Sequence, residues 1–242
     1  MSILEIMERQ LSATRTPVIV TAKVTNNQDP EHLGRIKVKY SWRDENDESD
    51  WIRIMTPMAG NQMGVYFIPE VDDEVVIAFQ NGNINFPIVL GGLWSNNIKP
   101  PDSNDDGENN IRMIKSRSGH KIIMDDKDGE EKVTIIDKSE NSIVIDSKEN
   151  LVTITSKQDM QLLAEDGKIT ISAKEIELRS SDGTTMESGA DFSVTASSGT
   201  FGVESNELSL KASAQGTLEA SAGLTVKASG NTTIKGAMVM IN

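Results

Sequence analysis

An eight-residue repeat runs from residue 140 to residue 242 and limits the folds that the chain can adopt. Most blocks carry two apolar residues two positions apart near their end, and start with small or polar residues. A period of two is typical of a strand with one buried face, and Ser, Gly, Asp and Asn favour tight bends. Each block therefore predicts a short strand followed by a bend. The apolar pairs include Val152 and Ile154, Ile176 and Leu178, Phe192 and Val194, Leu208 and Leu210, and Leu224 and Val226.

Such a repeat cannot bury a core within one chain. Each ordered residue costs roughly 1–2 kcal/mol of backbone entropy, and two apolar side chains in eight residues offset little of that cost. Three chains wound around one axis would give every strand neighbours on both edges and would direct the apolar pairs inward. We therefore expect residues 111–242 to form an intertwined homotrimeric β-helix, a three-faced β-prism, with these ten residues in its core.

The composition divides the chain near residue 100. All seven prolines lie at or before Pro101, and eight of the ten aromatic residues lie at or before Trp94. Proline is excluded where every backbone N–H joins a ladder, so the tail is suited to continuous pairing between chains. We predict an N-terminal docking segment (residues 1–15), a globular domain (residues 16–95), a polar linker (residues 96–110) and the β-prism (residues 111–242). Ile3, Leu4, Met7 and Leu11 could form one face of a short helix in the first segment, which either docks on another protein or packs on its own domain.

The globular domain has the pattern of an all-β fold. Five apolar or alternating runs lie between clusters of Asn, Asp, Gly and Pro, which predicts five strands at about residues 18–24, 34–40, 51–55, 75–79 and 86–90. Among small closed barrels, the OB-fold is the common five-stranded architecture. The fold class is therefore all-β, an OB barrel followed by the trimeric β-helix.

Charge excludes several functions. The formal net charge is −13, and both halves of the chain are acidic, which argues against nucleic acid as a partner and against an anionic membrane bound through a basic surface. The absence of cysteine excludes disulfides and thiolate metal sites. The first twelve residues carry Glu5 and Glu8 where a secretory signal would carry basic residues, so we expect no signal peptide.

An ordered series of motifs resembles one family. The series comprises residues 29–38 (DPEHLGRIKV), Trp42, residues 51–53 with Pro57, Ala59 and Gly60, residues 67–75 (FIPEVDDEV), Gly82, residues 87–91 (PIVLG), residues 118–122 (SGHKI), Asp125, Asp126 and residues 131–135 (EKVTI). It resembles the central spike proteins of contractile injection systems, which include VgrG and phage baseplate assembly protein V. Two positions depart from the family pattern, Asp72 where Gly is usual and Asn83 where Asp is common, and both are polar turn positions.

The resemblance implies a structural, non-enzymatic spike. It would be attached to a baseplate hub protein in a phage tail, a tailocin or another injection system, and would pierce the target cell envelope on sheath contraction. Few residues precede the OB region, so we expect a separate chain to form the hub, with the spike assembled in the producer cytoplasm and carried on the particle. The resemblance also implies a PAAR-like tip protein, which would bind Met238, Met240, Ile241 and Asn242. The alternative is that these residues pack inward and end the β-helix by themselves.

Other functions remain to be weighed. A trimeric β-helix can also be a tailspike that degrades polysaccharide or binds a receptor, although those enzymes use grooves rich in acids and aromatics. Residues 102–107 (DSNDDG) resemble the first half of a calcium loop, yet Met113 occupies the twelfth position, where Glu is expected, and the linker interpretation is favoured. His32 and His120 are the two histidines, too few to distinguish a Ser-His-Asp triad from chance, and His120 is interpreted as structural. We expect no catalytic residues, cofactor or metal site.

Overall fold

The structure of the chain is a computed structural model, which describes residues 19–42 and 47–241. The docking segment predicted at residues 1–15 lies outside the described residues. Strands dominate the described part, and its one helical element is the short 3-10 turn η1 (Gln80–Gly82). The chain divides into two units, Met1–Ile169 and Thr170–Asn242. The all-β class is confirmed.

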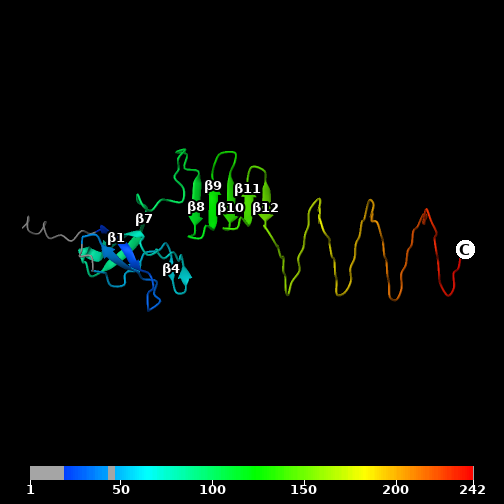
Figure 1. Ribbon diagram of the computed structural model, residues 1–242, viewed down its shortest axis with the longest axis horizontal. Coiled ribbons are helices and arrows are strands. Elements are labelled where there is room, and N and C mark those ends of the chain that lie inside the picture. Colours follow the sequence, from blue (N-terminus) through cyan, green and yellow to red (C-terminus); the bar gives the residue numbers. More distant parts are fainter. Residues whose placement is uncertain (1–18, 43–46, 242) are drawn as a thin grey trace, which may run out of the picture. The chain divides into compact units, whose positions relative to one another are not determined.

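Five strands form the sheet of the front domain, and Figure 1 shows them at the blue and cyan end of the ribbon. They are β1 (Ile19–Asn26), β2 (Lys37–Tyr40), β3 (Arg53–Ile54), β6 (Glu74–Phe79) and β7 (Pro87–Leu93), in the order β2-β1-β6-β7-β3. All pairs are antiparallel except β3–β7. An isolated bridge between Ile36 and Ile52 joins the two outer strands, so the sheet closes into a barrel. These are the five strands predicted from the sequence.

Alternation along these strands creates the barrel core. β6 alternates half-buried and buried residues along its whole length, and Val75, Ile77 and Phe79 point inward. The other buried apolar residues are Ala22, Val24, Ile36, Val38, Tyr40, Ile52 and Val89. A hairpin of two short strands, β4 (Ala59–Gly60) and β5 (Met63–Gly64), was not predicted. A side chain at Gly64 would meet the Met58 carbonyl oxygen at 2.3 Å, so the hairpin requires glycine there.

Five further strands form a second sheet. They are β8 (Ile111–Lys115), β9 (Lys121–Asp125), β10 (Lys132–Ile136), β11 (Ser142–Asp146) and β12 (Leu151–Thr155), and they lie side by side in chain order (Figure 1). Every pair is antiparallel and lies within one chain. This corrects the expectation of pairing between chains in residues 111–155. Short polar turns allow each strand to fold back onto the one before it. The backbone hydrogen bonds of the sheet are therefore formed between consecutive strands of the same chain.

From residue 156 to residue 241 the structure assigns no strand, yet the predicted repeat is present. Bends or turns fall at residues 157–158, 165–167, 174, 181–182, 189–190, 197–199, 206, 213–214, 221–222, 229–230 and 237. The chain therefore bends at every eighth residue or within one residue of it, on the second or third residue of each block. Figure 1 shows residues 170–241 as a zigzag of extended segments. Strands were expected here and are absent from the single chain, because these segments have no neighbour within hydrogen-bonding reach.

One buried carboxylate organises the loop between β1 and β2. Asp29 accepts hydrogen bonds from the backbone N–H groups of Glu31 and Leu33, both at 3.0 Å. The Arg35 guanidinium donates two more, from Nε at 2.8 Å and Nη2 at 2.7 Å. The Arg35 side chain, followed by these backbone donors, holds the pKa of Asp29 well below its usual range. Asp29 thus fixes the loop that contains His32, whose φ of 58° has a structural origin in this turn.

We predict that Asp29→Asn destabilises the barrel in a pH-dependent way. The side-chain amide of the variant would direct its own N–H groups at the backbone N–H and Arg35 donors that now bind the Asp29 carboxylate. The pKa of Asp29 is lower in the folded state than in the unfolded state, so its ionisation stabilises the barrel above the unfolded pKa of about 4. This stability is lost as the pH falls from about 4 towards the folded-state pKa. Thermal unfolding from pH 7 to pH 2 should show a gap between wild type and variant that narrows below about pH 4. The exposed Asp50→Asn is the control, and a gap independent of pH would contradict the prediction.

Candidate assembly surface

One face of the β8–β12 sheet is an apolar surface that this chain leaves uncovered. Cross-strand partners on this face form a row of five isoleucines, one from each strand: Ile114, Ile122, Ile135, Ile143 and Ile154. A second row contains Arg112, Met124, Val133, Ile145 and Val152. We call the nine apolar residues of these rows the apolar face. Their side chains are 38–61% exposed in the single chain, although matched apolar rows are a feature of sheet interiors.

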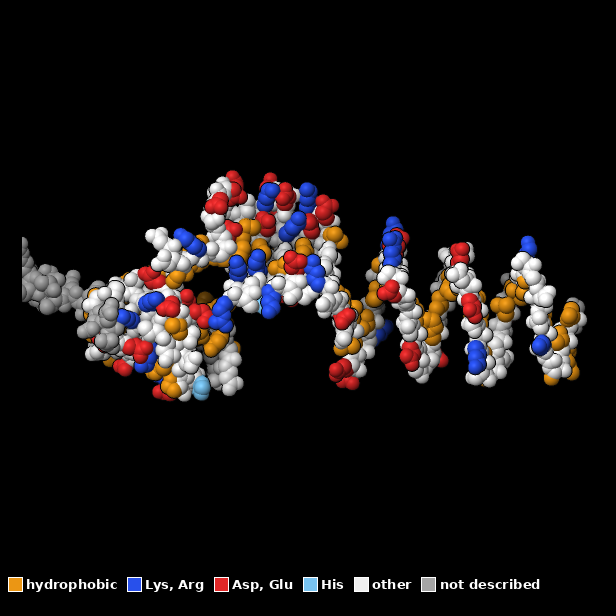
Figure 2. All heavy atoms as spheres, in the orientation of Figure 1, with side chains coloured by type: hydrophobic (Ala, Val, Ile, Leu, Met, Phe, Trp, Pro, Cys, Tyr) orange, Lys and Arg blue, Asp and Glu red, His pale blue; other side chains and the backbone are white. Residues whose placement is uncertain are grey.

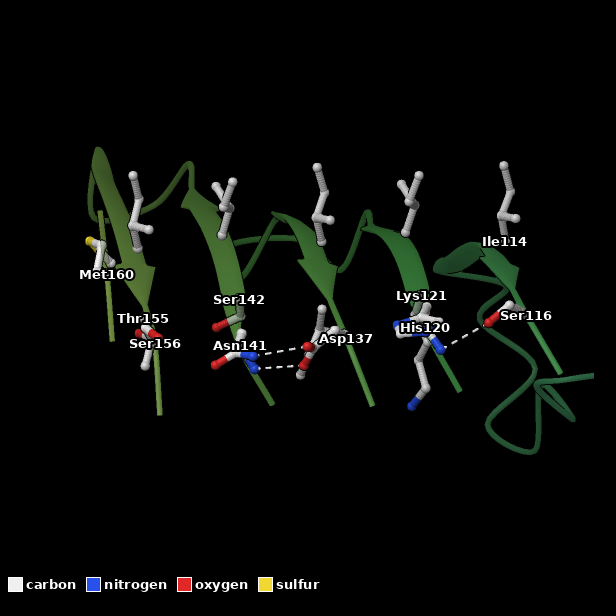
Figure 3. Close-up of a pocket in the computed structure, with 15 residues that line it drawn as sticks. Ile114, Ser116, His120, Lys121, Asp137, Asn141, Ser142, Thr155, Ser156 and Met160 are labelled. Carbon is white, nitrogen blue, oxygen red and sulfur yellow. Dashed lines mark hydrogen bonds between the residues drawn. The ribbon is translucent and has the colours of Figure 1, made fainter. Parts of the chain in front are cut away.

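Polar turn residues border the apolar face at one end of the strands. A hollow runs along the isoleucine row, and Figure 3 shows Ser116, His120, Asp137 and Asn141 along one edge of it, set apart from Ile114. Asn141 donates to Asp137 from its side chain at 2.9 Å and from its backbone at 2.8 Å. Ser116 Oγ accepts the backbone N–H of His120 at 3.1 Å. Through these hydrogen bonds Asn141 and Asp137 stabilise one turn and Ser116 stabilises the other.

One carboxyl group, that of Asp137, lines the hollow. The Asn141 side chain, followed by backbone N–H groups, lowers the pKa of Asp137, which keeps it ionised. Hydrogen bonds likewise lower the pKa values of Glu48, Glu130, Glu140 and Asp146, from the side chains of Thr25, Lys127 and Lys157 and from the backbone N–H of Glu149, respectively. A general acid requires the opposite shift. His120 contributes a backbone contact to its turn, in agreement with the structural role predicted for it.

The linker loop forms turns of its own. Asp102 Oδ1 accepts the N–H of Asn104 at 2.9 Å, and Asp106 Oδ1 accepts the N–H of Glu108 at 3.1 Å. Within residues 19–42 and 47–241, no group of three His, Asp or Glu side chains is placed to hold a metal ion. The calcium-loop pattern of residues 102–107 therefore corresponds to local turns that use the aspartates as acceptors.

The ten residues predicted for the trimer core are all exposed in the single chain. Val152 and Ile154 lie on the apolar face, and the other eight lie on the extended segments beyond residue 170. Every described residue from 157 to 241 is exposed. Figure 2 shows hydrophobic side chains recurring along the successive segments of residues 170–241. At the end of the tail Met238, Met240 and Ile241 are 77%, 81% and 88% exposed, while Asn242 lies outside the described residues.

The part of the apolar face that precedes residue 140 was not among the residues predicted for the trimer core. Ile122 and Met124, like Val133 and Ile135, have the two-residue spacing that identified the later pairs. The isoleucines of the first four strands follow each other at intervals of eight, thirteen and eight residues. The longer turn between β9 and β10 interrupts the repeat, so a search for a constant period misses these strands.

Comparison with known proteins identifies the front domain. Residues 20–94 match the family model of the "Type VI secretion system/phage-baseplate injector OB domain". The matched segment coincides with the five-stranded barrel described above. The chain is VgrG-like, and its barrel matches the injector OB domain.

Three VgrG relatives illustrate the extent of the similarity. The chain is 27% identical over 113 residues to the Type VI secretion system spike protein VgrG3 of Vibrio cholerae, which covers 43% of this chain and 11% of VgrG3. It is 29% identical over 146 residues to the spike protein VgrG1a of Pseudomonas aeruginosa, which covers 52% of this chain and 23% of VgrG1a. It is 35% identical over 75 residues to the actin cross-linking toxin VgrG1 of Vibrio cholerae, which covers 29% of this chain and 7% of that protein.

The VgrG-like chain thus spans less than a quarter of the length of each of these relatives. The resemblance to VgrG spike proteins that the motifs suggested is confirmed. No helix within the described residues is long and apolar enough to cross a membrane.

We predict that a charge at an apolar position of the apolar face or of the repeats prevents association, whereas a charge on the opposite face of the sheet does not. Ile135→Asp and Leu208→Asp would each place an unpaired carboxylate in a buried contact, which costs several kcal/mol per copy. Thr134→Asp, on the other face of β10, is the matched control. Size-exclusion chromatography with light scattering should show smaller species for the two apolar-site variants. Equal assembly by all three variants would mean that the register described here does not govern association.

Proposed function

We propose that this VgrG-like chain is the structural central spike of a phage tail or phage-tail-like contractile particle. Its OB barrel attaches to a baseplate hub protein, and residues 111–242 form a trimeric β-prism that enters the target cell envelope when the sheath contracts. One observation carries the proposal. The chain bends about every eight residues from 157 to 241, and every one of these residues is exposed and outside any strand. Such a segment acquires a core and a hydrogen-bond ladder only with other copies.

Three copies satisfy both requirements. Extended segments perpendicular to a common axis place a strand from another copy on each side, and the apolar pairs then face the axis. Strands stack about 4.8 Å apart, so a dozen octads give a rod on the order of 60 Å long. Rigidity follows from a continuous ladder, which is the mechanical property that a penetrating spike needs.

A non-enzymatic role agrees with the chemistry of the described residues. The hollow on the apolar face is bordered by side chains that serve their own turns, and Asp137 is held in its ionised form. The toxin activity named for one relative concerns a protein of which this chain covers 7%. Force transmission needs a rigid ladder and no reactive group.

The native mass tests the proposal directly. A prism of three chains predicts a particle of about three times 26.4 kDa, stable to dilution because strands of different copies interleave. Light scattering or native mass spectrometry at micromolar concentration measures it. A well-folded monomer would overturn the β-prism and the spike together.

We further propose that Met238, Met240, Ile241 and Asn242 contribute to the contact with a PAAR-like tip protein. The first three are exposed apolar side chains close together in sequence, and exposed apolar clusters commonly mark interfaces. Replacing Met238, Met240 and Ile241 with Ser should leave the oligomer intact and abolish co-purification of a recombinant PAAR-type protein from the same gene cluster. Serine at Leu218 and Ile234, farther from this segment, is the control. Unchanged co-purification would refute the contact.

A further inference from the structure

One turn at each end of the strands in the β8–β12 sheet carries a clear excess of charge, and the two excesses have opposite sign. The turn between β9 and β10 with its flanking residues, 125–132, contains five carboxylates and two lysines: Asp125, Asp126, Asp128, Glu130, Glu131, Lys127 and Lys132. The turn between β8 and β9, residues 115–121, contains Lys115, Arg117 and Lys121 and no carboxylate. Because consecutive strands are antiparallel, these turns lie at opposite ends of the strands. We call residues 125–132 the acidic end and residues 115–121 the basic end. The other turn that lies at the same end of the strands as the basic end, residues 136–142, contains Asp137, Lys138 and Glu140.

The basic end contains an uncompensated charge pair. Lys115 and Lys121 are direct cross-strand partners, and like charges in such positions destabilise a sheet. Arg117 pairs with Glu70 at 2.9 Å. Neither lysine has an ion-pair partner among the residues that the structure describes. The arrangement would therefore be favoured by carboxylates supplied from outside this sheet.

The acidic end shows the complementary excess. Lys127 and Glu130 pair at 2.9 Å, and Asp126 pairs with Arg112. Asp128 and Glu131 have no ion-pair partner within the described part of the chain. The two ends of one sheet thus offer unpaired charges of opposite sign.

Rotational symmetry brings these two ends together. In a ring of three sheets with their apolar faces inward, every sheet runs from its acidic end to its basic end in the same rotational sense. Each corner of the prism therefore joins the acidic end of one copy to the basic end of the next, a heterologous contact that closes into a ring. Long lysine and glutamate side chains can span the offset of one strand, about 4.8 Å, between the two turns.

We propose that the acidic end of one copy binds the basic end of the next copy, so that these corner contacts select a closed, one-way ring of identical chains. The inference rests on the proposed trimer and adds the surface that sets its direction. The partner is a second copy, because one sheet carries both halves of the contact and covers neither. The apolar faces become buried against one another, and the charged ends of the strands determine which ends meet at each corner.

Charge exchange tests the corner contacts in the full-length chain. Asp128→Lys with Glu131→Lys makes both ends basic, and Lys115→Glu with Lys121→Glu makes both ends acidic. The four substitutions together restore opposite ends in reversed order. We expect each pair alone to impair assembly and the combination to restore it. Arg117 is left unchanged because it pairs with Glu70.

Co-expression of two differently tagged chains gives the decisive measurement. Wild type with the fourfold variant would form mixed trimers that each contain two like-charge corners, and like-charge contacts disfavour association. Native mass spectrometry should therefore show mixed trimers reduced roughly tenfold or more relative to two tagged wild-type chains. Raising the salt to about 1 M, where the Debye length is about 3 Å, should restore part of the mixing. The control carries Asp50→Lys and Arg53→Glu in the barrel and should mix freely.

The outcomes separate this inference from the proposed function. If wild type is trimeric but the fourfold variant mixes with it statistically, the corner contacts are refuted and the spike stands. If the combination fails to restore the assembly lost in either pair, the pairing of ends is refuted as well. A monomeric wild type would overturn both.

Discussion

Unsatisfied backbone groups are the constraint on which the rest of this structure depends. Between residues 156 and 241 the chain is extended and exposed, with no ladder partner in the same chain. Water can solvate those groups in an isolated chain. However, nothing in an isolated chain offsets the conformational entropy lost in a regular zigzag, because its apolar side chains are not buried. The proline-free tail, the bend every eight residues and the spacing of apolar pairs all become intelligible when other copies complete the ladder.

The OB barrel was predictable because its signals are local. Alternation along β1 and β6, with turn residues at each end, marks strands without reference to the rest of the fold. The β4–β5 hairpin has strands of two residues, too short for any period to be visible. The buried role of Asp29 was also not foreseen, since a carboxylate among polar loop residues resembles a solvated one until the Arg35 contact is known.

In the second sheet, a constant sequence period does not reveal all the residues that lie side by side. Ile135 and Ile143 follow the octad spacing, whereas Ile122 and Ile135 are thirteen residues apart and still lie side by side. Topology also sorts the charges. Lysines and acids alternate along residues 115–150 with no evident order, yet the antiparallel meander places the basic turn 115–121 and the acidic turn 125–132 at opposite ends of the strands. Neither the apolar face nor its charged ends can be derived from composition alone.

The order of strands in the second sheet has a kinetic consequence. Each strand from β8 to β12 pairs with its immediate neighbours in sequence, so every contact of the sheet closes a short loop. Hairpins of this kind form in about 1–10 μs, whereas association of separate chains is slower and depends on concentration. The meander can therefore be complete before a second copy arrives. It ends in β12, an open edge that leads directly into the repeats. In the proposed trimer each chain would thus carry a finished template from which the repeats could be paired one after another.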